Sequence, residues 1–261
     1  MRKHNTFILA AIVLFALPAC TTLVPIPDSN FAVTDDQAVA AYGRVLAKYV
    51  NERGEVDFAA LQADSKDLDD YVAYIARSSS TEFHNPNDLL AHYLNSYNAL
   101  SMYNVIASGI PETNDGLAKV EFFGLRKFII GKQEMSLNQY ETDVIRPVGE
   151  PRVHFALNCS SLGCPALPRK PFTGANLDAE LEREARKFFA EARNLRVDDA
   201  QRTVYLSEIL AFYTGDFVKP KTPSLIAYVN QYIGKPIPLD YTVKFIDYDW
   251  TIANSKRKNK Q

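Results

Sequence analysis

The chain has 261 residues, of which 47% are hydrophobic, and its formal net charge at pH 7 is −2. This length and composition allow one large domain or two small ones with a substantial core. Nucleic acid is not expected as a partner, because nucleic-acid binding depends on an excess of Lys and Arg that neutralises phosphates.

Residues 1–20 have the pattern of a secretory signal peptide. Two basic residues precede an apolar run over residues 7–18, which is too short for a stable transmembrane helix. The ending LPAC resembles a bacterial lipobox, in which Cys20 becomes the lipidated first residue once residues 1–19 are removed. Thr21 after the cysteine resembles the signal for outer-membrane delivery. We therefore expect a lipoprotein on the periplasmic side of a cell envelope, with plain secretion or an uncleaved anchor as the alternatives.

Two flanking segments border the expected domain, which covers residues 35–250. Residues 20–34 hold two prolines and show no periodicity, so we expect a tether between lipid and fold. Residues 251–261 form a basic tail, expected as a solvated end, with contact to an anionic surface as the alternative. Loss of residues 1–19 removes two basic residues and leaves a net charge of −4.

Three helices are predicted in the first part of the domain, at residues 35–50, 65–77 and 86–108. Asp35 and the aspartate after it can cap the first helix, and an apolar stripe defines the second. Asn85 followed by proline is a strong start signal for the third, because proline lacks only an amide that would be unpaired there.

The third helix carries polar side chains within its apolar face. Asn98 falls on the same side as Leu94 and Met102. A buried amide without partners costs about 1–3 kcal/mol, so Asn98 should bond either a neighbouring backbone or a ligand in a cleft that it lines together with Asn95. The tyrosines of this helix are expected in the core, with stacking on a glycan or peptide as the alternative.

Residues 120–136 have the pattern of a hairpin, with strands at 120–130 and 132–136 that meet at Gly131. Ser136, with a glutamine three residues later, forms the capping box of a short helix that Pro147 ends. Glu141 lies near the second turn of that helix.

The segment RVHFALNCSSLGCPALP, residues 152–168, is where we expect the chemistry. It holds His154, Cys159 and Cys164, the last two being the cysteines that remain once the signal peptide is removed. Residues 152–157 alternate apolar and polar side chains, which predicts a strand with His154 and Asn158 on its polar face.

The remaining chain mixes helices and strands without a βαβ rhythm. Helices are predicted at about 176–192, 207–213 and 224–233, and strands near 203–206 and 242–248. This mixture predicts an α+β fold, a single compact domain of several helices packed on a small mixed or antiparallel sheet. The sequence holds no Gly-rich phosphate loop and no nucleophile elbow, and we predict no cofactor.

Four strings together are similar to the family known as domain of unknown function 547 (DUF547). They are AHYLNSYNALSMYNVI (91–106), SLNQYETDVIRP (136–147), the cysteine segment and FYTGDF (212–217), and their order and spacing match from about residue 40 to 240. The resemblance implies an uncharacterised domain with these site residues: Asn95, Asn98, Glu141, His154, Asn158, Cys159, Cys164, Tyr213, Asp216 and Phe217.

The chain departs from the family pattern at two positions. Tyr93 replaces a tryptophan, and Thr142 replaces a histidine that commonly follows the motif glutamate. We therefore give weight to His154 as the functional histidine. Tyr213 and Asp216 are expected to line a pocket or to end a helix that packs into the core.

The first interpretation of the cysteine segment is structural. In an oxidising periplasm Cys159 and Cys164 would form a disulfide, and closing so short a loop stabilises a fold by about 2 kcal/mol or less. The protein would then bind a small molecule, a peptide or an envelope partner.

The second interpretation is catalytic, with Cys159 as a nucleophile activated by His154. Glu141 or Asn95 would orient the histidine and Asn158 would bind the oxyanion, as in papain-like or transglutaminase-like acyl transfer on a peptide or amide. In an extended strand Cys159 faces away from His154, so this mechanism requires a turn at Asn158. The third interpretation is a zinc-dependent hydrolase using His154 and both cysteines, with His92 or Glu141 as a further ligand.

Overall fold

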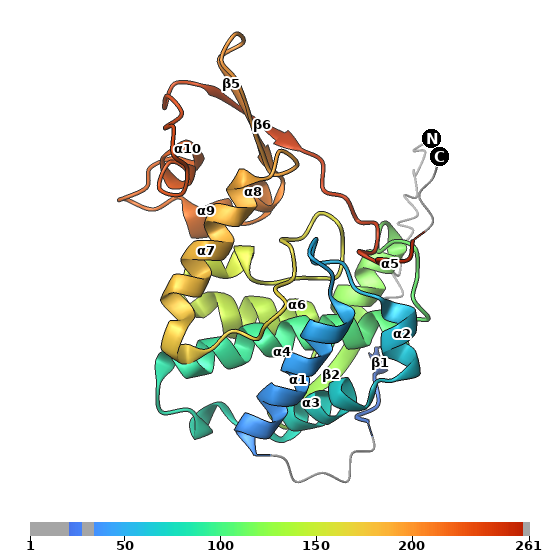
Figure 1. Cartoon of the computed structure of the whole chain (residues 1–261). Helices are drawn as coiled ribbons and strands as arrows, with labels where there is room; N and C mark the ends of the chain where they lie inside the picture. The colour runs from blue at the N-terminus through green and yellow to red at the C-terminus, as the bar shows by residue number, and fades with distance from the viewer. Residues whose placement is uncertain (1–20, 28–33, 258–261) are drawn as a thin grey trace, which may run out of the picture.

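The computed structural model describes residues 21–27 and 34–257. The expected signal peptide, the expected lipidation site Cys20, residues 28–33 and residues 258–261 lie outside the described residues. Figure 1 shows a lower layer of long helices and, above its left side, a group of short helices and strands reached through α7 (Leu177–Ala190). The fold is α+β, as the sequence predicts, and it carries two small mixed sheets of three strands each.

Three long helices build the larger part of the core. They are the three predicted helices, α1 (Asp35–Tyr49), α3 (Lys66–Arg77) and α4 (Pro86–Ala107). The cap of α1 is Thr34 rather than Asp35, because Thr34 forms a capping box with the glutamine three residues on. The apolar faces of these helices meet in one cluster of buried side chains.

The first sheet joins the start of the described chain to a hairpin. β1 (Thr22–Leu23) runs parallel to β2 (Arg126–Ile130), which pairs antiparallel with β3 (Gln133–Met135). The hairpin turns at Gly131 as predicted, with positive φ at that glycine and at the following lysine. The prediction that the first strand begins at residue 120 is wrong, since residues 121–125 form the π-helical turn η2 (Glu121–Leu125).

Residues 21–27, which belong to the segment expected as a tether, are docked on the domain. Thr22 pairs with Arg126, and Val24 donates its backbone N–H to Lys127 while its side chain is buried. The hydroxyl of Tyr103 donates to the carbonyl of Pro25, at 3.2 Å.

The second sheet belongs to the upper group of elements. β4 (Leu195–Asp198) is antiparallel to β5 (Thr203–Ser207), and β5 is parallel to β6 (Thr242–Ile246). With α7 and the short helices they enclose a second cluster of buried aromatic and aliphatic side chains. The short helices are α8 (Ile209–Phe212), α9 (Thr214–Phe217) and α10 (Leu225–Val229). β4 alternates apolar and polar residues over only four positions and buries none of them fully, so its signal in the sequence is weak.

The strand predicted at residues 152–157 is wrong. Residues 151–155 form the 3-10 helix η5 (Pro151–Phe155), whose first turn is capped by the Glu150 side chain. Val153 packs in the first core cluster and Phe155 in the second, so the apolar alternation reflects burial on two opposite sides rather than a pleated strand.

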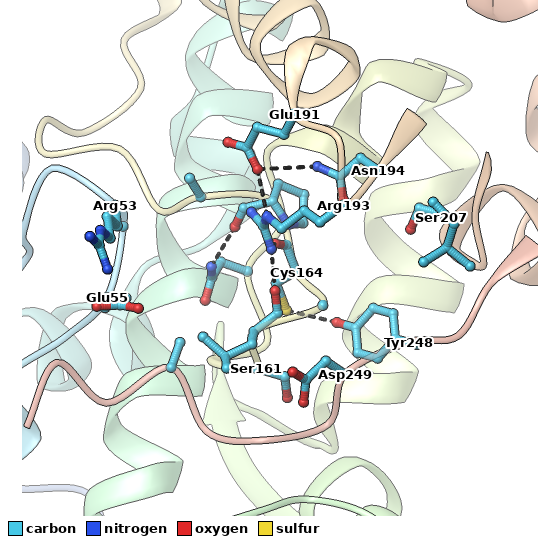
Figure 2. A pocket seen from close by; sticks show the side chains of 18 of the residues that line it. Arg53, Glu55, Ser161, Cys164, Glu191, Arg193, Asn194, Ser207, Tyr248 and Asp249 are labelled. Carbon is cyan, nitrogen blue, oxygen red and sulfur yellow. Dashed lines mark hydrogen bonds and ion pairs between the residues drawn. The ribbon is translucent and has the colours of Figure 1, made fainter. Parts of the chain in front are cut away.

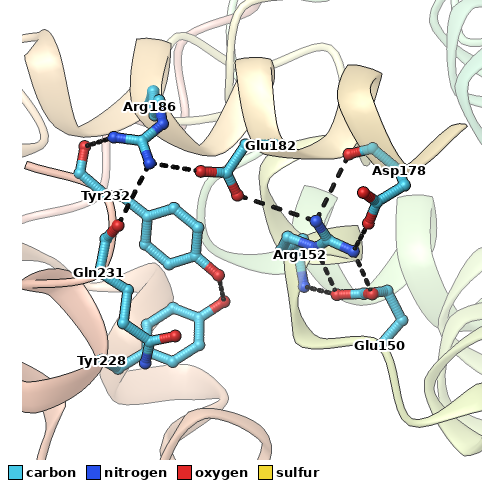
Figure 3. Close-up of polar contacts among 8 residues, drawn as sticks. All are labelled: Glu150, Arg152, Asp178, Glu182, Arg186, Tyr228, Gln231 and Tyr232. Atoms are coloured by element: carbon cyan, nitrogen blue, oxygen red, sulfur yellow. Dashed lines mark hydrogen bonds and ion pairs between the residues drawn. The ribbon is translucent and has the colours of Figure 1, made fainter. Parts of the chain in front are cut away.

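Ion pairs fix η5 against α7 (Figure 3). Arg152 bonds Glu150 and Asp178, each with an oxygen at 2.7 Å, and lies 3.8 Å from Glu182. Glu182 in turn pairs with Arg186 one turn further along the helix. The chain that leads into the cysteine segment is therefore held from the α7 side.

The other elements are short and connect the larger ones. They are α2 (Phe58–Ala63), η1 (Ser80–Glu82), α5 (Leu117–Val120), α6 (Leu137–Gln139), the π-helix η3 (Tyr140–Ile145), η4 (Arg146–Val148) and η6 (Gly174–Asn176). In the part of the chain that the structure describes, no helix has the length and apolar character needed to cross a bilayer.

Candidate functional site

A pocket of about 230 Å³ brings together most of the residues predicted for the site. Its wall includes Glu141, His154, Tyr213 and both cysteines, together with aromatic and basic side chains from other elements. The latter include Tyr97, Lys119, Phe123, Phe212, Tyr248 and Trp250. The pocket thus combines polar and aromatic side chains.

Glu141 lies on η3, the helix that the Ser136 capping box begins. Its carboxylate is buried and accepts a hydrogen bond from the Tyr97 hydroxyl at 3.1 Å. Burial raises the pKa of Glu141 above its usual range, while hydrogen bonding from Tyr213 and Tyr97 opposes this. A buried carboxyl with a raised pKa beside a pocket is typical of a functional group.

His154 is held by a charged pair from two other elements. Its Nε2 lies 2.8 Å from Asp216 Oδ2, and Arg146 Nε donates to the same oxygen at 2.7 Å. The ring stacks on Tyr213 with centroids 3.9 Å apart. Burial lowers the pKa of His154 to about 4, although the hydrogen bond to Asp216 acts in the opposite direction.

The neutral His154 has one nitrogen left for a ligand. Because an ionised carboxylate only accepts hydrogen bonds, the proton of the neutral ring sits on Nε2 and Nδ1 carries the lone pair. Burial acts to raise the pKa of Asp216, but hydrogen bonds from Arg146 and His154 keep it below its usual value. No residue in the described part of the chain bonds Nδ1.

The cysteine loop closes one wall of the pocket. Cys159 and Cys164 form a disulfide with Cα atoms 6.3 Å apart. The Tyr248 hydroxyl lies 3.0 Å from one sulfur and 2.9 Å from the other. Ser160, directly after the first cysteine, has φ of 63°, so the chain turns sharply there, two residues after Asn158, where the thiol mechanism requires its turn.

Two of the predicted asparagines hold this loop rather than face the pocket. Asn98 accepts from the backbone N–H of Asn158 at 2.7 Å and donates to the carbonyl of Ala156 at 2.9 Å. Asn158 itself donates to the carbonyl of Pro165 and accepts from the Ser160 N–H, so its side chain is committed to the loop. The sequence predicts that Asn98, because it lies in the apolar stripe of its helix, bonds either a neighbouring backbone or a ligand. The structure shows the backbone partner.

Asn95 lies apart from this pocket. Its amide exchanges two hydrogen bonds with the backbone of Phe172, both at 2.9 Å. His92 is nearby on the same helix, and burial lowers its pKa to about 4. In the described ranges, no three His, Cys, Asp or Glu side chains are grouped closely enough to hold a metal ion.

A second and larger pocket of about 530 Å³ lies on the other side of the cysteine loop (Figure 2). Cys164, Pro165 and Tyr248 line both pockets. Arg193 donates to the Cys164 carbonyl at 3.1 Å and contacts the carbonyl of Leu162. The loop is therefore a wall shared by two pockets.

Sequence reasoning missed Arg146, which bonds the partner of His154, and the pocket residue Tyr248. Arg146 reaches Asp216 across 70 positions, and Tyr248 reaches the cysteines across more than 80. Such pairings depend on packing and leave no local pattern. Tyr97 is one of the helix tyrosines expected in the core, with ligand stacking as the alternative, and it is buried and also lines the pocket.

These features define an α+β domain with a buried carboxyl and a neutral histidine beside a disulfide-closed loop. Residues 81–189 match the family model described as protein of unknown function, DUF547. That span contains Glu141, His154 and both cysteines, so the match to the DUF547 family model covers the segment that contributes these pocket residues. No curated protein and no solved structure gives a significant match to the chain.

Proposed function

We propose that this protein is a ligand-binding lipoprotein of the cell envelope, anchored in the membrane through a lipid on Cys20. The residue after Cys20 favours the outer membrane. Its ligand would be a small neutral molecule with N–H or O–H donors, such as a peptide or glycan fragment. The observation that carries the proposal is that two buried side chains with acceptor atoms, Glu141 and His154, line the same pocket.

The chemistry of the pocket favours such a ligand. The Glu141 carboxylate already accepts from Tyr97, and a carboxylate has further lone pairs, so a ligand donor can add a hydrogen bond to Glu141 and another to His154. Phe212 and Trp250 also line the pocket, and aromatic rings of this kind can contact a sugar ring or a peptide plane. Lys119 at the edge can donate to a carbonyl.

The single tryptophan gives a direct test. Trp250 lines the pocket, so its emission should shift saturably when a ligand enters. We would titrate the disulfide-bonded domain with N-acetylglucosamine oligomers and with short alanine peptides. Glu141→Gln should weaken binding about tenfold, as expected for one lost hydrogen bond to a charged or polarised acceptor. Glu134→Gln, an exposed carboxylate on β3, is the matched control. Equal affinities in both variants would contradict the proposed site.

A second candidate function is thiol-dependent acyl transfer, favoured by the presence of Cys159 and His154 in one pocket. An envelope dithiol would first reduce the disulfide. The Cys159 thiolate would then add to an amide carbonyl, the amine would leave with the proton taken up by His154, and water would hydrolyse the thioester.

The electrostatics of His154 weigh against this second candidate. An ordinary thiol has a pKa of about 8.5, and His154 has a pKa of about 4. Moving the proton from thiol to imidazole therefore costs about 6 kcal/mol before the two charges attract each other. The binding function needs no such transfer.

Intact mass after alkylation separates the two candidates. With Cys20 replaced, the native protein should take up no iodoacetamide and the reduced, denatured protein should take up two adducts. Labelling of Cys159 alone in the gently reduced native protein, faster than an ordinary thiol and lost in His154→Gln, would instead favour the acyl-transfer function.

A further inference from the structure

We propose that the segment formed by α5 and η2 lies on the lipid surface beside the anchor, with Leu117 and Val120 in the interface, so that the ligand pocket opens toward the membrane. The inference extends the proposed function, because it takes the lipid on Cys20 as given.

The expected anchor, Cys20, lies close in sequence to the folded domain. Residues 21–27 leave little slack, since Thr22 pairs with Arg126 and the side chain of Val24 is buried. Cys20 precedes Thr22 by two residues, a reach of about 7 Å in an extended chain. A lipid on Cys20 therefore fixes this edge of the first sheet close to the bilayer.

The second step is the register of β1. Because β1 and β2 are parallel and Thr22 pairs with Arg126, the start of β1 lies beside the start of β2, where η2 and, before it, α5 join the sheet. The segment from Leu117 to Leu125 is helical and spans about 12 Å at the rise of an α-helix. α5, β1 and β2 all lie on the right side of the view in Figure 1.

The third step is the apolar surface that this segment exposes. Leu117 is 89% exposed and Val120 is 55% exposed, and their spacing of three residues puts them on one face of the helix. Leu23, next to the anchor on β1, is 47% exposed. Large apolar side chains at such exposure are the kind that enter a membrane interface beside an existing lipid anchor.

The charges around this surface fit a lipid interface of low net charge. Glu121 is paired with Arg126 at 3.0 Å, and the exposed residues Asp115 and Lys119 add one charge of each sign. The contact therefore depends on apolar insertion, and vesicles of phosphatidylcholine alone are a suitable probe.

The segment formed by α5 and η2 also contributes to the ligand pocket. Lys119 and Phe123, from the same segment, line the pocket, and Lys119 Nζ lies 3.8 Å from the ring centroid of Trp250. A domain resting on α5 thus presents this edge of the pocket to the bilayer. Its ligand would be met at the membrane surface.

The test uses the full protein, purified with its lipid and reconstituted into phosphatidylcholine vesicles. A nitroxide is placed at residue 117, 120 or 239 through a cysteine substitution. Leu239 is the matched control, since it is 62% exposed and belongs to the distant loop before β6. At 117 and 120, collisions with oxygen should exceed collisions with a water-soluble nickel chelate, and at 239 the order should reverse.

Charged variants give a second readout at the pocket. Vesicles with brominated acyl chains should quench Trp250 in the wild type and in Leu239→Glu, and quenching should be lost in a Leu117→Glu/Val120→Glu variant. If the protein floats with vesicles but labels at 117 and 120 behave like the label at 239, the orientation is wrong. If the wild type does not float at all, the lipid anchor is wrong, and the orientation fails with it.

Discussion

Acidification should destabilise this protein through His154. Its pKa is about 4 in the folded protein and about 6.5 in an unfolded chain. On acidification the unfolded chain therefore binds the proton first, and stability present above pH 6.5 is lost as the pH falls toward 4. Asp216 does not prevent this, because Arg146 already bonds the same carboxylate oxygen and the ring is buried.

The size of the effect follows from the two pKa values. At 1.36 kcal/mol per unit, the difference of about 2.5 units gives a limit of about 3 kcal/mol at low pH. At pH 5 the unfolded histidine is almost fully protonated and the folded one almost fully neutral, which gives about 2 kcal/mol. His92 has the same lowered pKa and should contribute a similar amount.

Urea unfolding at pH 8 and pH 5, followed by circular dichroism, measures this loss. His154→Gln removes the titrating group, so the loss between the two pH values should shrink by about 2 kcal/mol relative to the wild type. His92→Gln is the matched variant outside the pocket and should give a similar reduction. A loss in His154→Gln as large as in the wild type would refute the reasoning, as would an NMR titration of His154 centred near 6.5.

Three further changes test the framework of the site. Asn98→Ala removes both bonds to the cysteine loop and should cost about 2–4 kcal/mol in urea unfolding, because it leaves buried backbone groups unpaired; a cost below 1 kcal/mol would mean that water replaces the amide. Asp216→Ala leaves Arg146 without its half-buried partner and should cost about 1–3 kcal/mol, whereas an unchanged unfolding midpoint would contradict that pairing. Replacing Cys159 and Cys164 by serine should cost about 2 kcal/mol, or about 4–8 °C in thermal unfolding, given the short loop they close; no change would show that the loop is fixed by its other contacts alone.

Local signals in the sequence located most elements correctly. The start of α4 at Asn85 and the capping box at Ser136 depend on side chains bonding amides two or three residues away. The turn at Gly131 depends on backbone conformation at two adjacent positions. Such features are complete within a few residues and can be recognised without the rest of the fold.

The failed predictions share a tertiary cause. Residues 152–155 alternate like a strand because Val153 and Phe155 enter two different core clusters, an arrangement that only the position of α7 makes possible. The sequence named His154 and Asp216 as candidates, but nothing in it joins two residues 62 positions apart. The neutral state of the histidine depends on Arg146 and on burial, which no motif encodes.

The contacts of the cysteine loop determine how far its two roles can be separated. These roles are to stabilise the fold through the disulfide and to form the wall between the two pockets. Asn98 holds the start of the loop, Arg193 holds the carbonyl of Cys164, and the Tyr248 hydroxyl contacts both sulfurs. These three contacts come from different parts of the chain and do not require the bond between Cys159 and Cys164. Reduction should therefore lower the free energy of unfolding, while the native loop keeps its place between the two pockets. A ligand that depends on Glu141 and His154 would then bind with similar affinity before and after reduction, whereas acyl transfer would begin only after it.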